Sequence, residues 1–385
     1  MNDRPTLHPA SPLLGHCPES LPAWTYFDSA HFEREMKMIW ARDWINVARV
    51  NELAPMAVKR IALAGQNLIL VRDHLDAITC FHNTCRHRGA ELCSAAETRL
   101  KSKLISCPYH EWSYDLQGHL VRTPFVLETP DFRKEKHSLF SVPVKIWNGF
   151  VFVCLADTPP DFDRAPDLGV DALDNWPLAD LVTGHTLVKE LACNWKIIWE
   201  NYNECLHCPG IHPELCDRVP VYAKGIMSAP EAMDWVPENA KSPVLQEGAR
   251  SWTVNGQPCG PEFPNLSIEE RARGHTFVTL YPTSYVVAHV DYVRTVSLRP
   301  LSAECTELTA RWLFAAETLA SPGFNLHNVT DFATTVIQQD GAACEMNQRG
   351  LKASAFKQGR LMPQEFDVYK FHNWLREAMP QEFAS

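Results

Sequence analysis

The chain has 385 residues, 45% hydrophobic and 21% charged, the composition of an ordinary globular protein that is long enough for two domains. Its formal net charge of −10, with no long run of Lys or Arg, argues against nucleic acid or an anionic membrane surface as a partner. The N-terminus lacks the apolar core of a signal peptide, no apolar stretch reaches membrane-spanning length, and the thirteen cysteines form no disulfide framework pattern. These features predict a cytoplasmic protein.

The first two parts of the chain are predicted to be an arm with a helix and then a small β domain. Residues 1–42 form the arm and helix, because positions 28–40 have an amphipathic pattern with Asp28 or Ser29 as the N-cap. In residues 43–155, short β-type segments alternate with turn signals, which predicts an all-β domain. We expect the N-terminal helix to pack not on this β domain but on the second domain, residues 156–385.

The remainder of the chain, residues 156–385, mixes both kinds of element, and this mixture indicates an α+β domain. Strands are expected at 276–287, 290–298 and 307–315. Helices are expected at 329–351 and 366–378.

Two short motifs in the β domain combine the same pair of ligand types. Cys85 and His87 form a C-x-H motif, and Cys107 and His110 form a C-x-x-H motif. In a Rieske centre two cysteines hold one iron of a [2Fe–2S] cluster and two histidines hold the other, so each motif can donate one ligand to each iron. A Cys2His2 zinc site is the alternative, although zinc sites more often contain a C-x-x-C spacing. After the second motif, a run ending at Gly118 predicts a hairpin.

The two motifs lack the additional cysteines of respiratory Rieske proteins. Those proteins carry a disulfide between the two loops, and the corresponding positions here are Ala90 and Tyr109, with Cys93 nearby but misplaced. Without this bridge we expect a reduction potential near the bottom of the roughly −150 to +300 mV range of Rieske centres. Such a cluster suits electron supply by a flavin or ferredoxin.

A second group of metal-binding side chains lies early in the α+β domain. The sequence is helix-compatible up to Cys208, which would place Glu200, Glu204 and His207 near one face. The following Pro–Gly pair is expected to break this helix and to turn His212 toward the metal that His207 binds. Two histidines and one carboxylate, with open positions left over, are the ligands of non-haem Fe(II) oxygenases.

The carboxylate of such a site has to come from another part of the chain. Asp340 on the late helix is our choice, and Glu345 is the competing ligand. Taken alone, the two histidines are more often ordinary surface or core residues, and the segment 205–208 suggests zinc. The Rieske motif favours iron, because a low-potential electron carrier needs an acceptor.

These motifs together resemble those of the Rieske non-haem iron oxygenases, specifically the oxygenase alpha component of a multi-component system. The resemblance covers nearly the whole chain. It implies an N-terminal all-β Rieske domain followed by a catalytic domain of helix-grip (START-like) type with an antiparallel sheet. It implies the cluster ligands Cys85, His87, Cys107 and His110, and the mononuclear iron ligands His207, His212 and Asp340.

The same resemblance implies how electrons reach the iron. Glu204 would be the acidic bridge between the cluster of one subunit and the iron of its neighbour, in a head-to-tail homotrimer. NAD(P)H would reduce a separate flavin/iron–sulfur reductase, because this chain has no Gly-rich dinucleotide fingerprint. The iron would then use O2 to oxidise a small-molecule substrate.

Finer features resemble the branch of glycine betaine, choline and carnitine oxygenases. Glu204 stands where many aromatic-ring dioxygenases have Asp, and the stretches 289–294 and 312–314 are similar to that branch. The implied reaction is hydroxylation and N-demethylation of a small quaternary ammonium compound, which aromatic faces would bind with about 0.5–2 kcal/mol each. Candidate aromatic residues are Trp235, Trp252, Phe277, Tyr281, Tyr285 and Tyr292.

Other functions remain as alternatives. The enzymatic one is hydroxylation or dihydroxylation of an aromatic acid by the same metals, which an essential small beta subunit would favour. The non-enzymatic ones are a plain electron carrier and a zinc-binding interaction protein. An electron carrier would leave the α+β domain and its paired histidines without a role.

Overall fold

The structure is a computed structural model of the chain and describes residues 7–162, 169–237 and 245–383. These residues form two compact units. The β unit comprises the described residues of 36–164 and 178–180, and the α+β unit comprises those of 1–35, 165–177 and 181–385.

The two units divide the chain several residues away from the expected boundaries at 42/43 and 155/156. Contacts on both sides explain the longer β unit. The Sγ atom of Cys154 lies 3.5 Å from the carbonyl oxygen of Arg42. The indole N–H of Trp44 donates to the carbonyl of Pro160 at 2.9 Å. Residues outside the predicted range therefore complete this unit.

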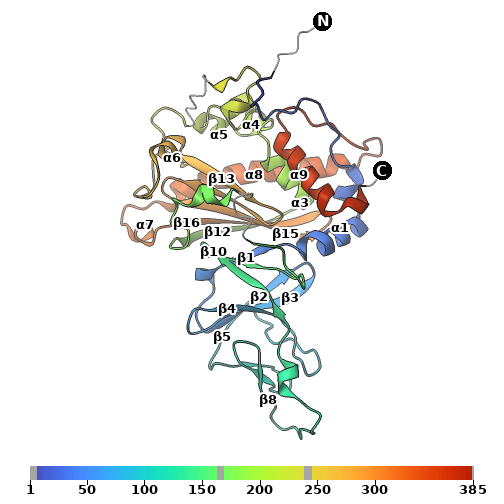
Figure 1. Cartoon of the computed structure of the whole chain (residues 1–385). Helices are drawn as coiled ribbons and strands as arrows, with labels where there is room; N and C mark the ends of the chain where they lie inside the picture. The colour runs from blue at the N-terminus through green and yellow to red at the C-terminus, as the bar shows by residue number, and fades with distance from the viewer. Residues whose placement is uncertain (1–6, 163–168, 238–244, 384–385) are drawn as a thin grey trace. The chain divides into compact units, whose positions relative to one another are not determined.

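The β unit contains three antiparallel sheets with strand orders β1–β11–β10, β5–β2–β3–β4–β9 and β6–β7–β8 (Figure 1). The strands are β1 Ile45–Arg49, β2 Ala57–Leu63, β3 Gln66–Arg72, β4 Ile78–His82, β5 Glu97–Arg99, β6 Ile105–Ser106, β7 Ser113–Tyr114, β8 Leu120–Arg122, β9 Ser141–Val142, β10 Val144–Trp147 and β11 Phe150–Val153. The core between the sheets includes Cys85 and Cys107, so both predicted cluster motifs begin from buried positions.

The hairpin expected after the second motif is present as β7 and β8. Gly118 in its turn has a φ of 86°, a conformation that side-chain-bearing residues rarely adopt. A Cβ atom there would come within 2.5 Å of the Phe81 ring. Only glycine therefore allows the hairpin to close over this part of the core.

The α+β unit is built on a five-stranded antiparallel sheet with the order β12–β16–β15–β14–β13 (Figure 1). Its strands are β12 Val182–Leu191, β13 His275–Leu280, β14 Ser284–His289, β15 Val293–Ser302 and β16 Cys305–Phe314. Its helices are α1 Ser29–Glu35, α3 Trp195–Tyr202, α4 Cys208–Ile211, α5 Pro213–Arg218, α6 Ile268–Arg273, α7 Ala316–Ala320, α8 Leu326–Leu351 and α9 Phe366–Ala378. The long helix α8 contacts β12, and α3 contacts β15, α8 and α9. The predicted α+β class with an antiparallel sheet is confirmed.

Two of the predicted elements differ in detail from the structure. The single strand expected at 276–287 is a hairpin of β13 and β14, because Pro282 lacks the N–H needed to continue the ladder and Thr283 N–H instead donates to Leu280 at 2.9 Å. The helix expected at 28–40 is α-helical only as α1, and Met36–Trp40 forms a π-helical turn.

Helix α1 is joined to α3 by a buried ion pair. The Nζ atom of Lys196 lies 2.6 Å from Oε1 of Glu35, and both side chains are 1% exposed. The indole N–H of Trp195 donates to the other carboxylate oxygen at 3.0 Å. Because both charges are desolvated, this pair specifies one arrangement of the N-terminal helix within the α+β unit.

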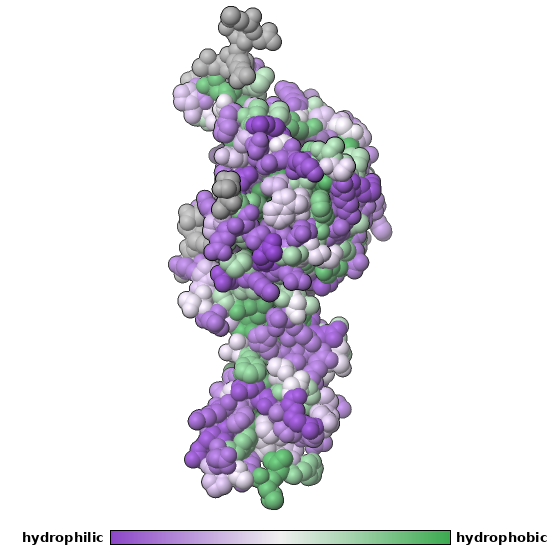
Figure 2. Space-filling model, turned by 90° about the vertical axis from the view of Figure 1, so that its right-hand side faces the viewer, coloured by the Kyte–Doolittle hydropathy of each residue, from purple (hydrophilic) through white to green (hydrophobic). Residues whose placement is uncertain are grey.

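The face in Figure 2 is mainly hydrophilic, as the net charge leads one to expect. Hydrophobic side chains come to the surface locally, and Phe125 and Leu127 are the most exposed large ones. Within the described part of the chain, no helix is both long enough and apolar enough to cross a membrane.

Candidate metal centres and substrate cavity

Both cysteine–histidine motifs of the β unit lie on short loops that backbone hydrogen bonds close. The N–H of Cys85 donates to the carbonyl of Ala90 at 2.8 Å, and the N–H of Cys107 donates to that of Trp112 at 2.8 Å. These bonds hold each cysteine at the base of its loop and direct the histidine toward the other loop.

Of the four side chains, the two cysteines are neighbours of each other, and so are the two histidines. Burial raises the pKa of the Cys85 thiol, Tyr114 Oη at 3.2 Å from its sulfur opposes this rise, and the neighbouring Cys107 thiol adds to it. The rings of His87 and His110 lie 4.7 Å apart. Nδ1 of His87 is buried and has no hydrogen-bond partner among the described residues. Thiols on one side and imidazoles on the other fit a two-iron cluster better than a single zinc ion.

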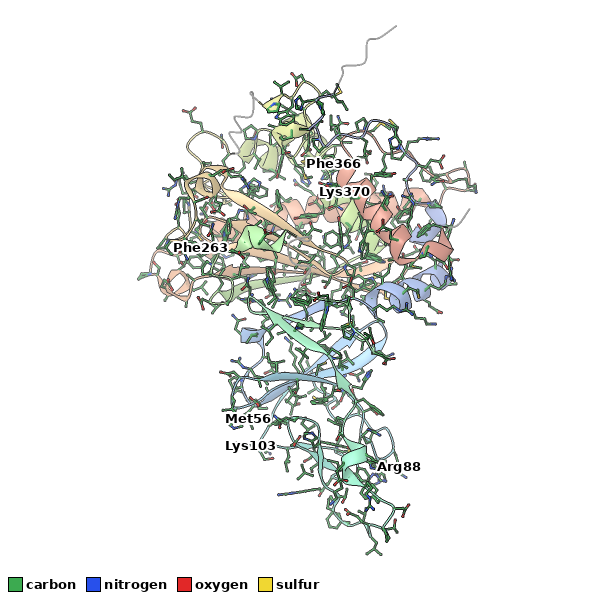
Figure 3. The ribbon with its side chains drawn as sticks, in the orientation of Figure 1. Met56, Arg88, Lys103, Phe263, Phe366 and Lys370 are labelled. Atoms are coloured by element: carbon green, nitrogen blue, oxygen red, sulfur yellow. A yellow bond between two sulfur atoms is a disulfide. The ribbon has the colours of Figure 1, made fainter. Side chains whose placement is uncertain are left out.

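His110 lies at the more exposed edge of this group, beside Arg88. The Arg88 side chain is labelled in Figure 3. The Arg88 guanidinium lies 3.3 Å from Nε2 of His110 and over the Tyr109 ring. Desolvation first, and then the Arg88 charge, lower the pKa of His110. The His87 ring is stacked on Trp112 at 4.6 Å. Both imidazoles are therefore positioned by neighbours on the same two loops.

The helix expected to continue to Cys208 ends earlier, at Tyr202. The side-chain amide of the C-cap residue Asn203 donates a hydrogen bond to the Tyr281 hydroxyl at 2.7 Å. Pro209 lies in the first turn of α4, where a proline is tolerated, and so it starts a helix instead of breaking one. As a result Glu200 does not share a face with His207, and its carboxylate binds Tyr26 and His372 instead.

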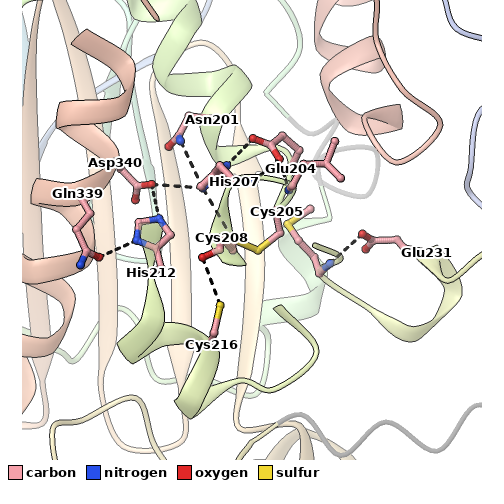
Figure 4. The surroundings of a disulfide bond; sticks show 12 residues. Asn201, Glu204, Cys205, His207, Cys208, His212, Cys216, Glu231, Gln339 and Asp340 are labelled. Atoms are coloured by element: carbon pink, nitrogen blue, oxygen red, sulfur yellow. Dashed lines mark hydrogen bonds and ion pairs between the residues drawn. A yellow bond between two sulfur atoms is a disulfide. The ribbon is translucent and has the colours of Figure 1, made fainter. Parts of the chain in front are cut away.

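The structure brings His207, His212 and Asp340 together (Figure 4). Nε2 of His212 lies 2.8 Å from Oδ1 of Asp340, and Nε2 of His207 lies 3.5 Å from the same oxygen. Each residue offers a donor atom within 4.8 Å of the others, and within the described ranges no other three His, Cys, Asp or Glu residues do so. Two imidazoles and a carboxylate fit a mononuclear Fe(II) ion with open positions.

Each imidazole is oriented through its second nitrogen. Nδ1 of His207 lies 2.5 Å from Oε1 of Glu204, and the other Glu204 oxygen accepts from the backbone of Leu206. Nδ1 of His212 lies 2.7 Å from Oε1 of Gln339. Hydrogen bonds of this kind fix the tautomer and ring direction of metal-binding histidines. Sequence reasoning missed Gln339, although its place directly before Asp340 is a usable signal.

The two imidazoles are both hydrogen-bond partners of the carboxylate. Burial acts against the charged form of His207, but the hydrogen bonds that it donates to Asp340 and Glu204 outweigh it and raise the pKa to about 9. Burial likewise opposes ionisation of Asp340, while the two histidines lower the pKa of this carboxyl. A carboxylate stabilised between two imidazoles is a site where a divalent cation can replace the shared protons.

Three other residues from the sequence analysis have different partners. The carboxylate of Glu345, the competing ligand, accepts from the backbone N–H of Ala192 at 3.0 Å. Cys205 and Cys208 form a disulfide across the turn that carries His207 (Figure 4). This bond removes both thiols as zinc ligands, and the sequence analysis did not anticipate it. The other eleven cysteines have free thiols.

A cavity of about 90 Å³ opens beside the three candidate ligands. It lies among α3, α8 and the helix-facing side of the sheet. The small volume suits a small substrate. Of the aromatic candidates, Trp252, Phe277 and Tyr285 line it, together with Tyr202 and Tyr222.

The other three aromatic candidates lie elsewhere. Trp235 lines an adjoining cavity beside Arg273, which shares Phe277 with the first one. Tyr281 packs on Phe371, and Tyr292 is fully buried and donates its hydroxyl to the Trp252 carbonyl at 2.7 Å.

Two family models match the chain. The one described as ring hydroxylating alpha subunit (catalytic domain) matches residues 178–381, and the Rieske [2Fe–2S] domain matches residues 43–133. The chain therefore belongs to the family of ring-hydroxylating oxygenase alpha subunits and is a Rieske-type oxidoreductase. The family resemblance stated from the motifs is confirmed.

Among the relatives, the glycine betaine monooxygenase oxygenase subunit of Pseudomonas aeruginosa (strain UCBPP-PA14) is 27% identical over 94% of this chain and 89% of its own. A solved quaternary ammonium Rieske monooxygenase, described for carnitine oxidation and inter-subunit electron transfer, has a TM-score of 0.73 at 23% identity, covering 94% and 96%. Naphthalene 1,2-dioxygenase from Rhodococcus sp. has a TM-score of 0.71 at 16% identity, covering 95% of each chain. The two structures show that this fold accommodates different substrates.

Proposed function

We propose that this chain is the oxygenase component of a monooxygenase that hydroxylates and N-demethylates a small quaternary ammonium compound. The observation that carries the proposal is that the three candidate iron ligands line a small cavity whose other walls are largely aromatic. Aromatic faces attract a methylated cation, and the relative from P. aeruginosa is named for glycine betaine.

The metal ligands form part of the proposal. We assign Cys85, His87, Cys107 and His110 to the [2Fe–2S] cluster, and His207, His212 and Asp340 to a mononuclear Fe(II). When bound, the iron supplies the activation of O2 that a C–H bond requires. The protein orients His207 through Glu204 and His212 through Gln339, and its apolar walls exclude water from the substrate.

Hydroxylation of an N-methyl group gives an N-hydroxymethyl compound. The N–CH2OH carbon then leaves as formaldehyde, the nitrogen keeps the electron pair of the broken C–N bond, and the hydroxyl proton is released. One oxygen atom of O2 enters the product, and two electrons from NAD(P)H are needed to reduce the other to water.

Electron delivery is a further part of the proposal. A separate reductase would supply the cluster, and Glu204 would connect the cluster of a neighbouring subunit with His207 in a homotrimer. The hydrogen bond between Glu204 and His207 supports this role, as does the inter-subunit transfer described for the related structure. The large number of free thiols supports a location in the cytoplasm.

The proposal is tested by formaldehyde release. Iron-loaded protein with a surrogate reductase and NADH is offered glycine betaine, choline, carnitine and stachydrine, and also benzoate-type acids. Formaldehyde that depends on one of the methylated compounds and matches O2 uptake is the expected result. Hydroxylated benzoate without formaldehyde would establish the aromatic-acid alternative instead.

A further inference from the structure

Arg294 is a buried cation in the substrate cavity without an anionic partner. Its side chain is 7% exposed and lines the same cavity as Asp340. Its Nε–H has no hydrogen-bond partner, and the guanidinium forms no ion pair within the described ranges. By contrast, the other deeply buried arginine, Arg49, donates to the carbonyls of Asn148 and Leu178. An unpaired buried charge is costly, so it points to a missing partner.

The sheet directs Arg294 toward the cavity. On β15 it lies opposite Val287 of β14, and two residues further along Val296 lies opposite Tyr285. Because alternate residues of a strand share a face, Arg294 and the cavity residue Tyr285 face the same side. The nearby carboxylate of Asp291 is already used by the Ser251 hydroxyl and the Cys259 N–H, at 2.6 and 2.5 Å.

Two further cavity residues have buried donors without partners among the described residues. They are the hydroxyl of Tyr202 and the indole N–H of Trp252. Indole and guanidinium groups can only donate hydrogen bonds, and a hydroxyl can also donate. The cavity thus has several donors and a fixed positive charge, and a carboxylate, which only accepts, complements them.

The aromatic side chains of the cavity favour a cation, whereas the donors just described favour a carboxylate. The rings of Tyr202 and Tyr285 are stacked at 3.8 Å, and Phe277 and Tyr222 complete an aromatic wall. Such a wall attracts a methylated ammonium group, but the unneutralised charge of Arg294 repels it. A zwitterion resolves this conflict, because its carboxylate neutralises the arginine.

We propose that Arg294 binds a substrate carboxylate and that the enzyme consequently selects zwitterionic methylated amino acids over choline. The ammonium part of this proposal rests on the proposed function, whereas the carboxylate site does not. Arg294 is thus a specificity-determining residue that places the N-methyl groups toward the iron ligands.

The test measures equilibrium binding by calorimetry on the full-length, iron-loaded protein without O2. The probes are glycine betaine, its isosteric amide, choline and benzoate. We compare wild type with Arg294→Gln and, as matched control, Arg299→Gln. Arg299 is on the same strand but faces the other side and pairs with Glu307. Thermal midpoints of all three proteins check folding.

In wild type, glycine betaine should bind at least about 30-fold more tightly than either its amide or choline. This is the loss of affinity expected when one member of a buried charge pair is missing. Arg294→Gln should abolish that preference, while Arg299→Gln should keep it. Without ligand, Arg294→Gln should not lower the thermal midpoint, because it removes an unpaired buried charge. Millimolar glycine betaine should raise the midpoints of wild type and Arg299→Gln, but not that of Arg294→Gln.

The outcomes separate the two proposals. If benzoate binds in an Arg294-dependent way and no ammonium compound binds, the carboxylate site stands and the proposed function fails. If formaldehyde is released from glycine betaine but Arg294→Gln binds it within about 3-fold of wild type, the carboxylate site is overturned and the proposed function stands. Equal binding of choline and glycine betaine by wild type also overturns the inference.

Discussion

Oδ1 of Asp340 lies 2.8 Å from Nε2 of His212, although the two residues are 128 positions apart in the chain. The carboxylate comes from α8, and the imidazole comes from the junction of α4 and α5. Two elements that are remote in the sequence thus bring an imidazole and a carboxylate oxygen together, and this makes the group a candidate metal site.

The first prediction concerns this carboxylate. Asp340→Ala should reduce the iron content from about three to about two atoms per chain, because the cluster remains and the mononuclear site loses a ligand. Turnover should disappear while the visible Rieske spectrum is unchanged. Iron analysis and the spectrum provide the measurement. Glu345→Ala is the control and should retain the third iron; the reverse pattern would make Glu345 the ligand.

The second prediction concerns Gln339, whose amide oxygen lies 2.7 Å from Nδ1 of His212. Gln339→Ala should weaken Fe(II) binding by about 10–100-fold, the usual effect of removing an orienting partner. Iron affinity is measured by competition with a chelator. The neighbouring Gln338 is exposed, so Gln338→Ala should leave the affinity unchanged. Equal affinities in the two variants would exclude an orienting role for Gln339.

The third prediction concerns Glu204. Glu204→Gln should keep both metal sites filled but lower coupled turnover by about 10–100-fold or more, because the anionic partner of His207 is lost. Single-turnover oxidation of the pre-reduced cluster in the presence of substrate is the measurement. Normal cluster oxidation in this variant would rule out the bridging role. Glu345→Gln is the matched control.

The fourth prediction concerns the stability of the α+β unit. Lys196→Met leaves the buried Glu35 carboxylate uncompensated and should lower the free energy of unfolding by about 3–5 kcal/mol. Urea denaturation at pH 7 measures the change. Lys370 pairs with Asp367 on the surface, so Lys370→Met should have almost no effect. A similar small loss in both variants would mean that the buried pair does not stabilise the fold.

The fifth prediction follows from the pKa of Glu35. Burial acts to raise this pKa, but Lys196 and His31 outweigh it, so the folded-state value is lowered. The stabilisation is therefore complete above the unfolded-state pKa of about 4.3 and is lost as the pH falls through the folded-state value. The difference in unfolding free energy between wild type and Lys196→Met should shrink below about pH 4. A difference independent of pH would show that Glu35 is not ionised in the folded protein.

Local patterns in the sequence were sufficient for several features of this protein. The cysteine–histidine spacings indicated the cluster motifs, and helix α9 begins and ends where its periodicity predicted. The mixture of helix and strand patterns predicted the α+β class, the motif resemblance implied its antiparallel sheet, and both are confirmed. These features depend on residues close together in the chain, where ligand spacing, hydrophobic period and turn chemistry act directly.

Other features depend on contacts between distant elements. The sequence left Asp340 and Glu345 as competing ligands, and the packing of α8 directs Asp340 to the histidines and Glu345 to Ala192. The unpartnered state of Arg294 likewise becomes visible only when the surrounding strands and helices are in place, since burial and the absence of a neighbour are properties of the assembled core. Long-range packing brings together side chains that no local spacing relates, and so it determines which polar groups are satisfied within the protein and which await a ligand.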